Sequence, residues 1–134
     1  MKPFHWPVRV YWEDTDAGGV VYYANYLKFM ERARSEWLRA RGFEQDVLRD
    51  EAGIVFVVRR VEIDYLSPAR FNDQLDVSVA LHDVRRASLR VLQELMHGAT
   101  RLAKAEVTLA CVDASRFKAV KIPAPLIENL VQTT

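Results

Sequence analysis

One amphipathic helical stripe, followed almost entirely by strand-like segments, limits what this chain can fold into. Between about Asn25 and Arg41 the apolar residues recur at the spacing of one helix face, and they are Tyr26, Phe29, Met30, Ala33 and Trp37. Gly42 follows the last basic residues, as is common just past a helix C-terminus. We therefore predict one long helix over residues 25–41 with a buried face.

Strand signals surround this helix. Val8–Trp12 is short, β-branched and aromatic, which predicts a first strand. Four further strands are predicted after the helix, over Ile54–Tyr65, Leu75–Leu81, Ser88–Met96 and Leu102–Val112. The stretch from Pro123 to Val131 is expected to form a helical turn or a short tail helix.

This order favours an α+β fold with an antiparallel sheet over alternating βαβ units. The helix would be about 25 Å long at ~1.5 Å per residue, and the strand over Ile54–Tyr65 about 40 Å at ~3.3 Å per residue. Strands so much longer than the helix must curve around it. We predict a single domain over residues 1–134, in which a sheet wraps around one central helix.

Composition narrows the functional classes. Lys and Arg number 19 and Asp and Glu 18, a net charge of +1, which argues against a nucleic-acid partner. Cys111 is the only cysteine, so neither an internal disulfide nor a multi-cysteine zinc site can form. No apolar run approaches the roughly 20 residues that span a bilayer. These features lead us to expect a cytoplasmic protein.

The segment between the first strand and the helix, "EDTDAGG" from Glu13 to Gly19, is open to several interpretations. It could be a solvated loop whose acidic residues complement the helix dipole. A calcium loop fits poorly, because the closing glutamate is missing. A phosphate cradle fits worse, since the segment lacks the P-loop lysine and its carboxylates repel phosphate.

A catalytic interpretation also fits this segment. Adjacent glycines let the backbone approach a ligand or adopt positive φ. The helix behind them presents unpaired backbone N–H groups with partial positive charge. A carboxylate beside such donors can attack a polarised carbonyl or activate water on it. That design requires neither metal nor cofactor.

The residues that carry this pattern also resemble a known family. "DTDAGGVVYYANYLKFMERAR" is similar to the active-site segment of hotdog-fold acyl-CoA thioesterases of the 4-hydroxybenzoyl-CoA thioesterase type. The segments "FVVRRVEIDYLSPARFNDQL" and "AEVTLACVD" resemble the YbgC-like subfamily, which is associated with the bacterial Tol-Pal system. The resemblance covers nearly the whole chain.

The resemblance implies a hotdog fold, with a five- to six-stranded antiparallel sheet around the long helix. It implies hydrolysis of acyl-CoA to a carboxylic acid and coenzyme A, in homodimers or homotetramers with active sites between subunits. Asp16 matches the catalytic carboxylate, as nucleophile or general base, and the backbone N–H near Tyr23 matches the donor that polarises the thioester. Gly18 and Gly19 would shape the turn.

Further residues are candidates for contact with the substrate. Asn25 is expected to cap the helix or to touch the substrate, and Asp14 to hold the loop by accepting backbone N–H bonds. Tyr65 and Ser67 are candidates for the pantetheine channel. Arg59 and Arg60 are candidates for the phosphates of coenzyme A, because Arg pairs well with phosphate.

The sequence departs from the subfamily at one position, where Tyr23 stands in place of a usual histidine. Tyrosine can donate a hydrogen bond but is no base near neutral pH. Two alternatives to an acyl-CoA thioesterase stay open. One is a thioesterase that acts on acyl carrier protein, and the other is a non-catalytic scaffold at the inner membrane face. The identity of the acyl chain also stays open.

Overall fold

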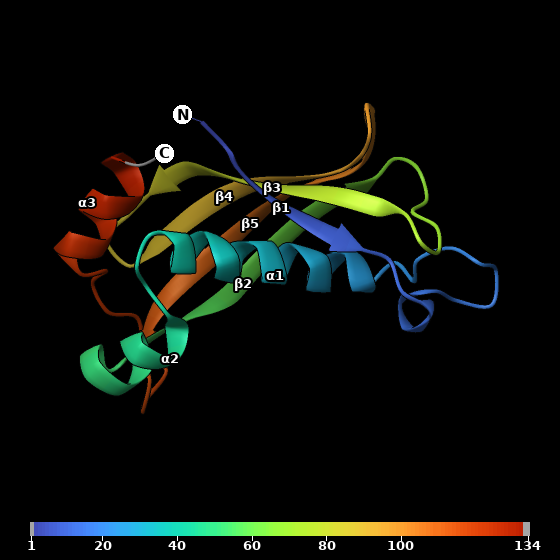
Figure 1. Ribbon diagram of the computed structural model, residues 1–134. Helices are drawn as coiled ribbons and strands as arrows, with labels where there is room; N and C mark the ends of the chain where they lie inside the picture. The colour runs from blue at the N-terminus through green and yellow to red at the C-terminus, as the bar shows by residue number, and fades with distance from the viewer. Residues whose placement is uncertain (1, 133–134) are drawn as a thin grey trace.

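The computed structural model describes residues 2–132, in which five strands form one antiparallel sheet (Figure 1). The strands lie in the order β1-β3-β4-β5-β2, so β1 and β2 are the two edges. The strand bounds are Phe4–Arg9 for β1, Ile54–Tyr65 for β2, Gln74–Val84 for β3, Ser88–His97 for β4 and Thr100–Asp113 for β5. The predicted α+β class and the four later strands are confirmed.

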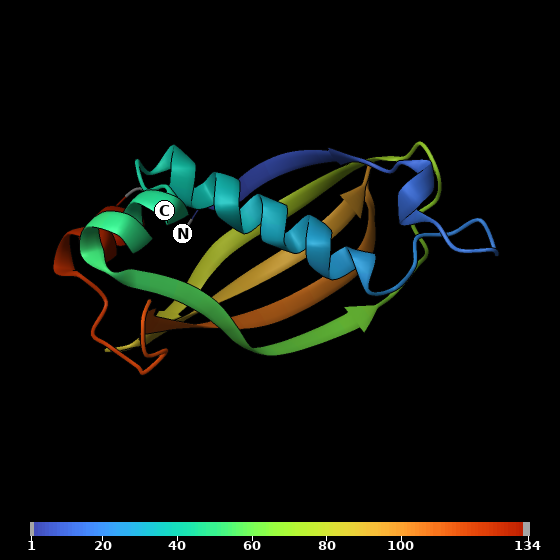
Figure 2. The same cartoon turned by 90° about the horizontal axis from the view of Figure 1, so that it is seen from below.

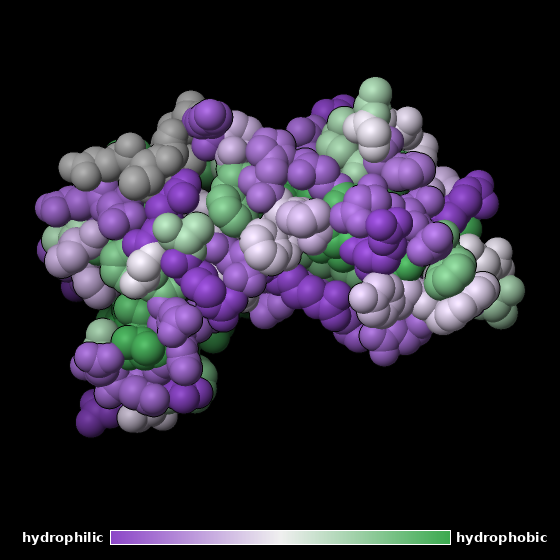
Figure 3. Space-filling model, in the orientation of Figure 1, coloured by the Kyte–Doolittle hydropathy of each residue, from purple (hydrophilic) through white to green (hydrophobic). Residues whose placement is uncertain are grey.

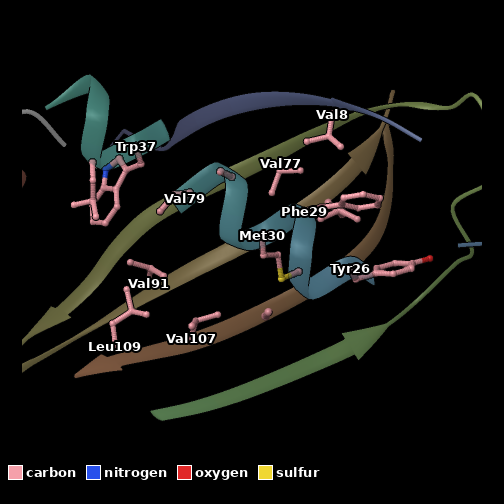
Figure 4. Packing of buried hydrophobic residues seen from close by; sticks show 14 of the residues in the cluster. Val8, Tyr26, Phe29, Met30, Trp37, Val77, Val79, Val91, Val107 and Leu109 are labelled. Carbon is pink, nitrogen blue, oxygen red and sulfur yellow. The ribbon is translucent and has the colours of Figure 1, made fainter. Parts of the chain in front are cut away.

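The helix α1 spans Asn25–Ala40 and packs across one face of the sheet (Figures 1 and 2). Its predicted stripe is buried: Phe29, Met30, Ala33 and Trp37 are fully enclosed, and Tyr26 is 3% exposed. Figure 4 shows this stripe facing valines of β3, β4 and β5. Burying one large apolar side chain contributes about 1.5–3 kcal/mol, so this stripe fixes α1 on the sheet.

Shorter helical segments complete the described chain. A 3₁₀ turn covers Trp12–Asp14, α2 covers Gln45–Val47, and a π-helical stretch continues it over Leu48–Ala52. The helix α3 spans Ala124–Gln132, which confirms the predicted tail helix. Sequence patterning did not predict the segment from α2 to residue 52, which carries no buried residue and hence no apolar stripe.

The predicted first strand, Val8–Trp12, is wrong in its position. The strand β1 begins at Phe4 and ends at Arg9, and it includes Pro7. Proline is tolerated there because β1 is an edge strand that pairs only with β3. Trp12 instead enters the 3₁₀ turn, which Asp14 stabilises by accepting a hydrogen bond from the Tyr11 N–H at 2.8 Å.

The segment before α1 and the connection between β2 and β3 meet at one end of the molecule, at the right in Figures 1 and 3. Val21 N–H bonds the Ala69 carbonyl at 2.8 Å, and Val10 N–H bonds the Asp73 carbonyl at 2.9 Å. The segment before α1 is thereby tied to the connection between β2 and β3. Figure 3 shows this end as pale and green residues among purple ones. Its exposed large residues include Tyr11, Trp12, Tyr22, Tyr23, Leu66 and Phe71.

Candidate active site

The acidic, glycine-rich segment folds into a small hairpin ahead of α1. Thr15 and Val21 form an antiparallel bridge, and Asp16 N–H bonds the Val20 carbonyl at 2.8 Å. Gly19 N–H closes the turn on the Asp16 carbonyl at 3.1 Å, with Gly19 at φ +81°. A three-residue hairpin loop needs a left-handed residue at this position, which is why a glycine stands there.

The Asp16 carboxylate is exposed on this turn. Its Oδ1 accepts a hydrogen bond from the Gly18 N–H at 2.8 Å, which orients the side chain. A Cβ on Gly18 would lie 3.2 Å from that same oxygen, so glycine leaves room for the carboxylate. No residue among 2–132 donates a hydrogen bond to Asp16 Oδ2. That oxygen is free to meet water or substrate.

Asp14 anchors the hairpin to α1. It is 5% exposed, its Oδ2 accepts from the Tyr11 N–H, and its Oδ1 accepts from Asn25 Nδ2 at 3.2 Å. Its carbonyl also accepts the Tyr22 N–H at 2.9 Å. The predicted role of Asp14 in holding the loop is confirmed. Of the two aspartates in this segment, Asp14 is therefore a buried structural carboxylate, whereas the carboxylate of Asp16 is exposed.

The predicted capping role of Asn25 is wrong. The N-cap position is Ala24, which has helical backbone angles and no side-chain cap, and Asn25 is the first residue of α1. The Asn25 amide turns back to Asp14 because that buried carboxylate needs a donor. Asn25 is itself buried, and its contact with a substrate stays a prediction.

The N-terminus of α1 leaves backbone donors unused. Within residues 2–132, no acceptor is hydrogen-bonded to the backbone N–H of Tyr23 or of Ala24. These groups carry the partial positive charge of the helix N-terminus. They can therefore stabilise negative charge developing on a carbonyl oxygen.

A cavity of about 290 Å³ opens beside these donors. The Tyr65 hydroxyl donates to the Tyr23 carbonyl at 3.0 Å, and the two rings meet edge to face at 6.1 Å. The lining residues are Val21, Tyr23, Tyr26, Tyr65, Leu66, Ser67 and Pro68. Three predicted site residues, Tyr23, Tyr65 and Ser67, therefore come together from two distant parts of the chain.

Tyr26 belongs to this cavity although sequence patterning assigned it only to the core. Its hydroxyl accepts a hydrogen bond from the Ala69 N–H at 2.9 Å, and its ring contacts Tyr65 at 5.1 Å. Burial raises the pKa of Tyr26, and burial followed by the neighbouring tyrosines raises the pKa of Tyr65. Both phenols therefore stay neutral hydrogen-bonding groups across the physiological range.

The structure does not bring Arg59 and Arg60 to this cavity. They lie at a bulge in β2 between Val58 and Arg60, roughly 17–20 Å along the strand from Tyr65 at ~3.3 Å per residue. Both are exposed, and Arg60 pairs with Glu62. Their assignment to the phosphates of coenzyme A stays a prediction.

The described residues hold neither a metal-ligating cluster nor a membrane-spanning helix. Across residues 2–132, no three or more His, Cys, Asp or Glu side chains are grouped so as to hold a metal ion. None of the helices in that part of the chain is long and apolar enough to cross a membrane. Cys111 is buried in the core on β5, where its desolvation raises the thiol pKa.

Comparison with known proteins decides the family. The profile of the Thioesterase-like superfamily matches residues 10–130. The chain belongs to this superfamily. It is 48% identical over 120 residues to the acyl-CoA thioesterase YbgC of Haemophilus influenzae, covering 90% of this chain and 88% of that one. It is 43% identical to the acyl-CoA thioester hydrolase YbgC of Escherichia coli, covering 96% of each chain.

Solved structures of similar proteins have the same fold as this chain. A probable thioesterase from Bartonella henselae matches with a TM-score of 0.86 and 35% identity, covering 91% of this chain and 100% of that one. A hypothetical protein from Aquifex aeolicus matches with a TM-score of 0.89 and 30% identity, covering 95% and 98%. The predicted YbgC-like hotdog fold and its thioester hydrolase class are confirmed.

Proposed function

We propose that the protein hydrolyses acyl-CoA thioesters to a carboxylic acid and coenzyme A, with Asp16 as the catalytic carboxylate. Two observations carry this proposal: the Asp16 carboxylate is oriented and exposed on the hairpin that leads into α1, and the N-terminus of α1 leaves backbone donors unused. The names of the two YbgC relatives, an acyl-CoA thioesterase and an acyl-CoA thioester hydrolase, supply the substrate class.

The geometry of the hairpin supports this proposal. Asp16 lies opposite Val20, and the Cα atoms of Val20 and Tyr23 are at most about 11 Å apart even in fully extended chain. We infer that the thioester binds between the two groups, with its carbonyl oxygen toward the Tyr23 N–H. One such donor is worth about 10²–10³ in kcat in acyl-transfer enzymes.

Two routes use the same carboxylate. In the first, Asp16 Oδ2 attacks the carbonyl carbon, the C–S bond breaks, coenzyme A leaves as its thiolate, and water then hydrolyses the mixed anhydride. In the second, Asp16 takes a proton from water as the water attacks, and the same C–S bond breaks. Rapid quenching followed by intact-mass measurement separates them, because only the first route adds the acyl mass to the protein.

We also propose a homodimer formed along β2. This strand is an edge of the sheet, twelve residues long, with Val58 exposed at 48%. Long edge strands are sites of pairing with another chain. Light scattering coupled to size-exclusion chromatography should give twice the monomer mass of 15.5 kDa, or a multiple of the dimer mass. A monomer at micromolar concentration would contradict this assembly.

The test of the function is coenzyme A release, followed with a thiol reagent over a panel of short, long and aromatic acyl-CoAs. The same acyl groups on acyl carrier protein serve as the matched comparison. We expect turnover with kcat/KM higher on coenzyme A than on the carrier protein. The reverse order would assign the protein to the carrier-protein thioesterases, and no turnover on either would overturn the proposal.

A further inference from the structure

The peptide unit that joins Tyr23 to Ala24 lies at the start of α1 and has one unused group. Its N–H, which belongs to Ala24, has no hydrogen-bond acceptor among residues 2–132. Its carbonyl, which belongs to Tyr23, accepts from the Tyr26 N–H at 3.3 Å and from the Tyr65 hydroxyl at 3.0 Å. Because a trans peptide is planar, its C=O and N–H point in opposite directions. The donors that hold the carbonyl therefore also fix the direction of the free N–H.

The first turn of α1 restrains this peptide unit less than the one before it. The preceding unit, which carries the Tyr23 N–H, is held by a bond of 2.8 Å from the Asn25 N–H to the Tyr22 carbonyl. The equivalent bond from the Tyr26 N–H is 3.3 Å long, beyond the commonest length of about 2.9–3.0 Å. The Tyr65 hydroxyl therefore supplies a restraint that the turn by itself does not provide.

The side chain of Tyr65 is itself well placed to act as a fixed donor. Tyr65 is the last residue of β2, and its backbone pairs with Ala103 of β5. Its ring meets the ring of Tyr26 at 5.1 Å and that of Tyr23 at 6.1 Å, in both cases edge to face. The hydrogen bond to the Tyr23 carbonyl is made within one chain, so pairing of β2 with a second copy is not needed to form it.

A hydrogen bond to a carbonyl also makes the N–H of the same peptide unit a stronger donor. Hydrogen bonds that follow one another polarise each other, which strengthens each by roughly 10–30%. Burial, followed by the neighbouring tyrosines, raises the pKa of Tyr65, so the phenol keeps its proton near neutral pH. The Ala24 N–H is therefore oriented and polarised by a side chain that comes from the end of β2.

We propose that the Ala24 N–H is a second donor to the thioester carbonyl oxygen, beside the Tyr23 N–H, and that Tyr65 is the positioning residue that orients and polarises it. The inference rests on the proposed function and goes beyond it, because it adds a donor and gives Tyr65 a role other than contact with pantetheine. Successive N–H groups at a helix N-terminus point the same way and can bind one anionic oxygen together. Both bonds strengthen as negative charge develops on that oxygen.

The first test is the kinetics of Tyr65→Phe, which removes the hydroxyl and keeps the ring. Coenzyme A release should show a kcat about threefold to tenfold lower, the value of one neutral hydrogen bond, with KM unchanged. KM should not change because the donors act mainly on charge that develops in the transition state. A raised KM at unchanged kcat would make Tyr65 a substrate contact and would overturn the inference.

Tyr22→Phe is the matched control. Tyr22 is exposed, its ring lies 5.0 Å from that of Tyr23, and its hydroxyl has no hydrogen-bond partner among residues 2–132. The change removes one phenol hydroxyl from the same end of α1 and should leave kcat and KM unchanged. Thermal unfolding of both variants checks that each is folded at the assay temperature.

The second test measures the strength of the donors on a bound thioester. The probe is octanoyl-CoA or benzoyl-CoA, whichever the wild type hydrolyses faster, labelled isotopically at the thioester carbonyl carbon and bound to Asp16→Asn protein. In infrared difference spectra we expect the carbonyl band at a lower frequency than in the free thioester. Adding Tyr65→Phe should reduce that shift by about 10–30%, whereas adding Tyr22→Phe should leave it unchanged. A side chain that only stabilises the fold would not alter this band.

The outcomes separate the inference from the proposed function. If no acyl-CoA is hydrolysed, the proposed function fails and the inference fails with it. If the wild type is active, two results overturn the inference alone. They are a Tyr65→Phe variant that keeps the wild-type kcat, and one that loses kcat while the bound carbonyl band keeps its full shift. A lower kcat together with a smaller shift, and neither change in Tyr22→Phe, is the expected result.

Discussion

Adding one methyl group at Gly18 should reduce activity without reducing stability. The Cβ of Gly18→Ala would lie 3.2 Å from Asp16 Oδ1, so the carboxylate must shift by a few tenths of an ångström. That shift loosens the 2.8 Å bond from the Gly18 N–H that orients Asp16. Loss of one hydrogen bond to a charged group is worth about 1.5 kcal/mol, which predicts a drop of about tenfold in kcat.

The expected effect of the same change on stability has the opposite sign. Gly18 does not have the left-handed φ of its neighbour Gly19, so alanine can adopt its backbone conformation. Replacing glycine by alanine at such a position stabilises a protein by about 0.4–1 kcal/mol, through the entropy of the unfolded chain. We therefore expect the unfolding temperature of Gly18→Ala to stay level or to rise slightly.

Gly19→Ala is the matched comparison. A Cβ there meets no atom within 4 Å, but φ is +81°, which costs an alanine about 1–2 kcal/mol. This variant should lose several degrees of unfolding temperature while its kcat stays near that of the wild type. Coenzyme A release and differential scanning calorimetry measure the two effects. Full kcat in Gly18→Ala, or an equal loss of stability in both variants, would refute the account of the turn.

Four further expectations follow from the same contacts. Tyr23→Phe should leave kcat close to that of the wild type in the coenzyme A release assay, because the backbone N–H and not the phenol polarises the thioester; a hundredfold loss would contradict this. Tyr65→Phe removes the hydrogen bond to the Tyr23 carbonyl and should lower kcat severalfold, with about 1 kcal/mol lost in urea unfolding. Asp14→Asn weakens the contact with Asn25 and should destabilise the protein by about 1–3 kcal/mol, measured by urea unfolding, since it disturbs a buried hydrogen-bonded group. Burial raises the pKa of Tyr26, so the stability linked to its neutral form is fully present below the unfolded value of about 10 and is lost as pH rises through the raised value. Alkaline unfolding followed by circular dichroism should therefore show a stability loss above pH ~10 that is smaller in Tyr26→Phe, where Tyr65, whose pKa burial also raises, still contributes.

The elements that could be predicted from sequence are those in which a repeat spacing decides burial. The stripe of α1 requires a buried face. The alternation of Val61, Ile63 and Tyr65 in the second half of Ile54–Tyr65 favours a strand, and both elements were placed correctly. The first strand was misplaced because Tyr11 and Trp12 have high strand propensity. The carboxylate of Asp14 outweighs that propensity by bonding the Tyr11 N–H, which turns the chain into a 3₁₀ turn.

The contacts within the candidate site could not be predicted from the sequence, because they depend on features that the spacing of residue types along the chain does not contain. Asn25 is of a residue type that commonly caps helices, yet its amide donates a hydrogen bond to the buried carboxylate of Asp14, eleven residues earlier. The neighbourhood of Tyr23 and Tyr65 arises from the pairing of distant segments. One buried contact did have a signal in the sequence. Gln93 stands on the inward side of β4 between Val91 and Leu95, and a polar residue on that side needs a buried partner, which is Arg34 of α1.

The most direct test of the central claim is the kcat of Asp16→Asn on the best acyl-CoA substrate, relative to the wild type at equal unfolding temperature. Asparagine keeps the size of the side chain and can still accept the Gly18 N–H, but it can neither attack nor take a proton. The account predicts a loss of about 10²–10⁴ in kcat, the range of a general base. Equal rates in the two proteins would contradict it and leave Asp16 a structural part of the turn.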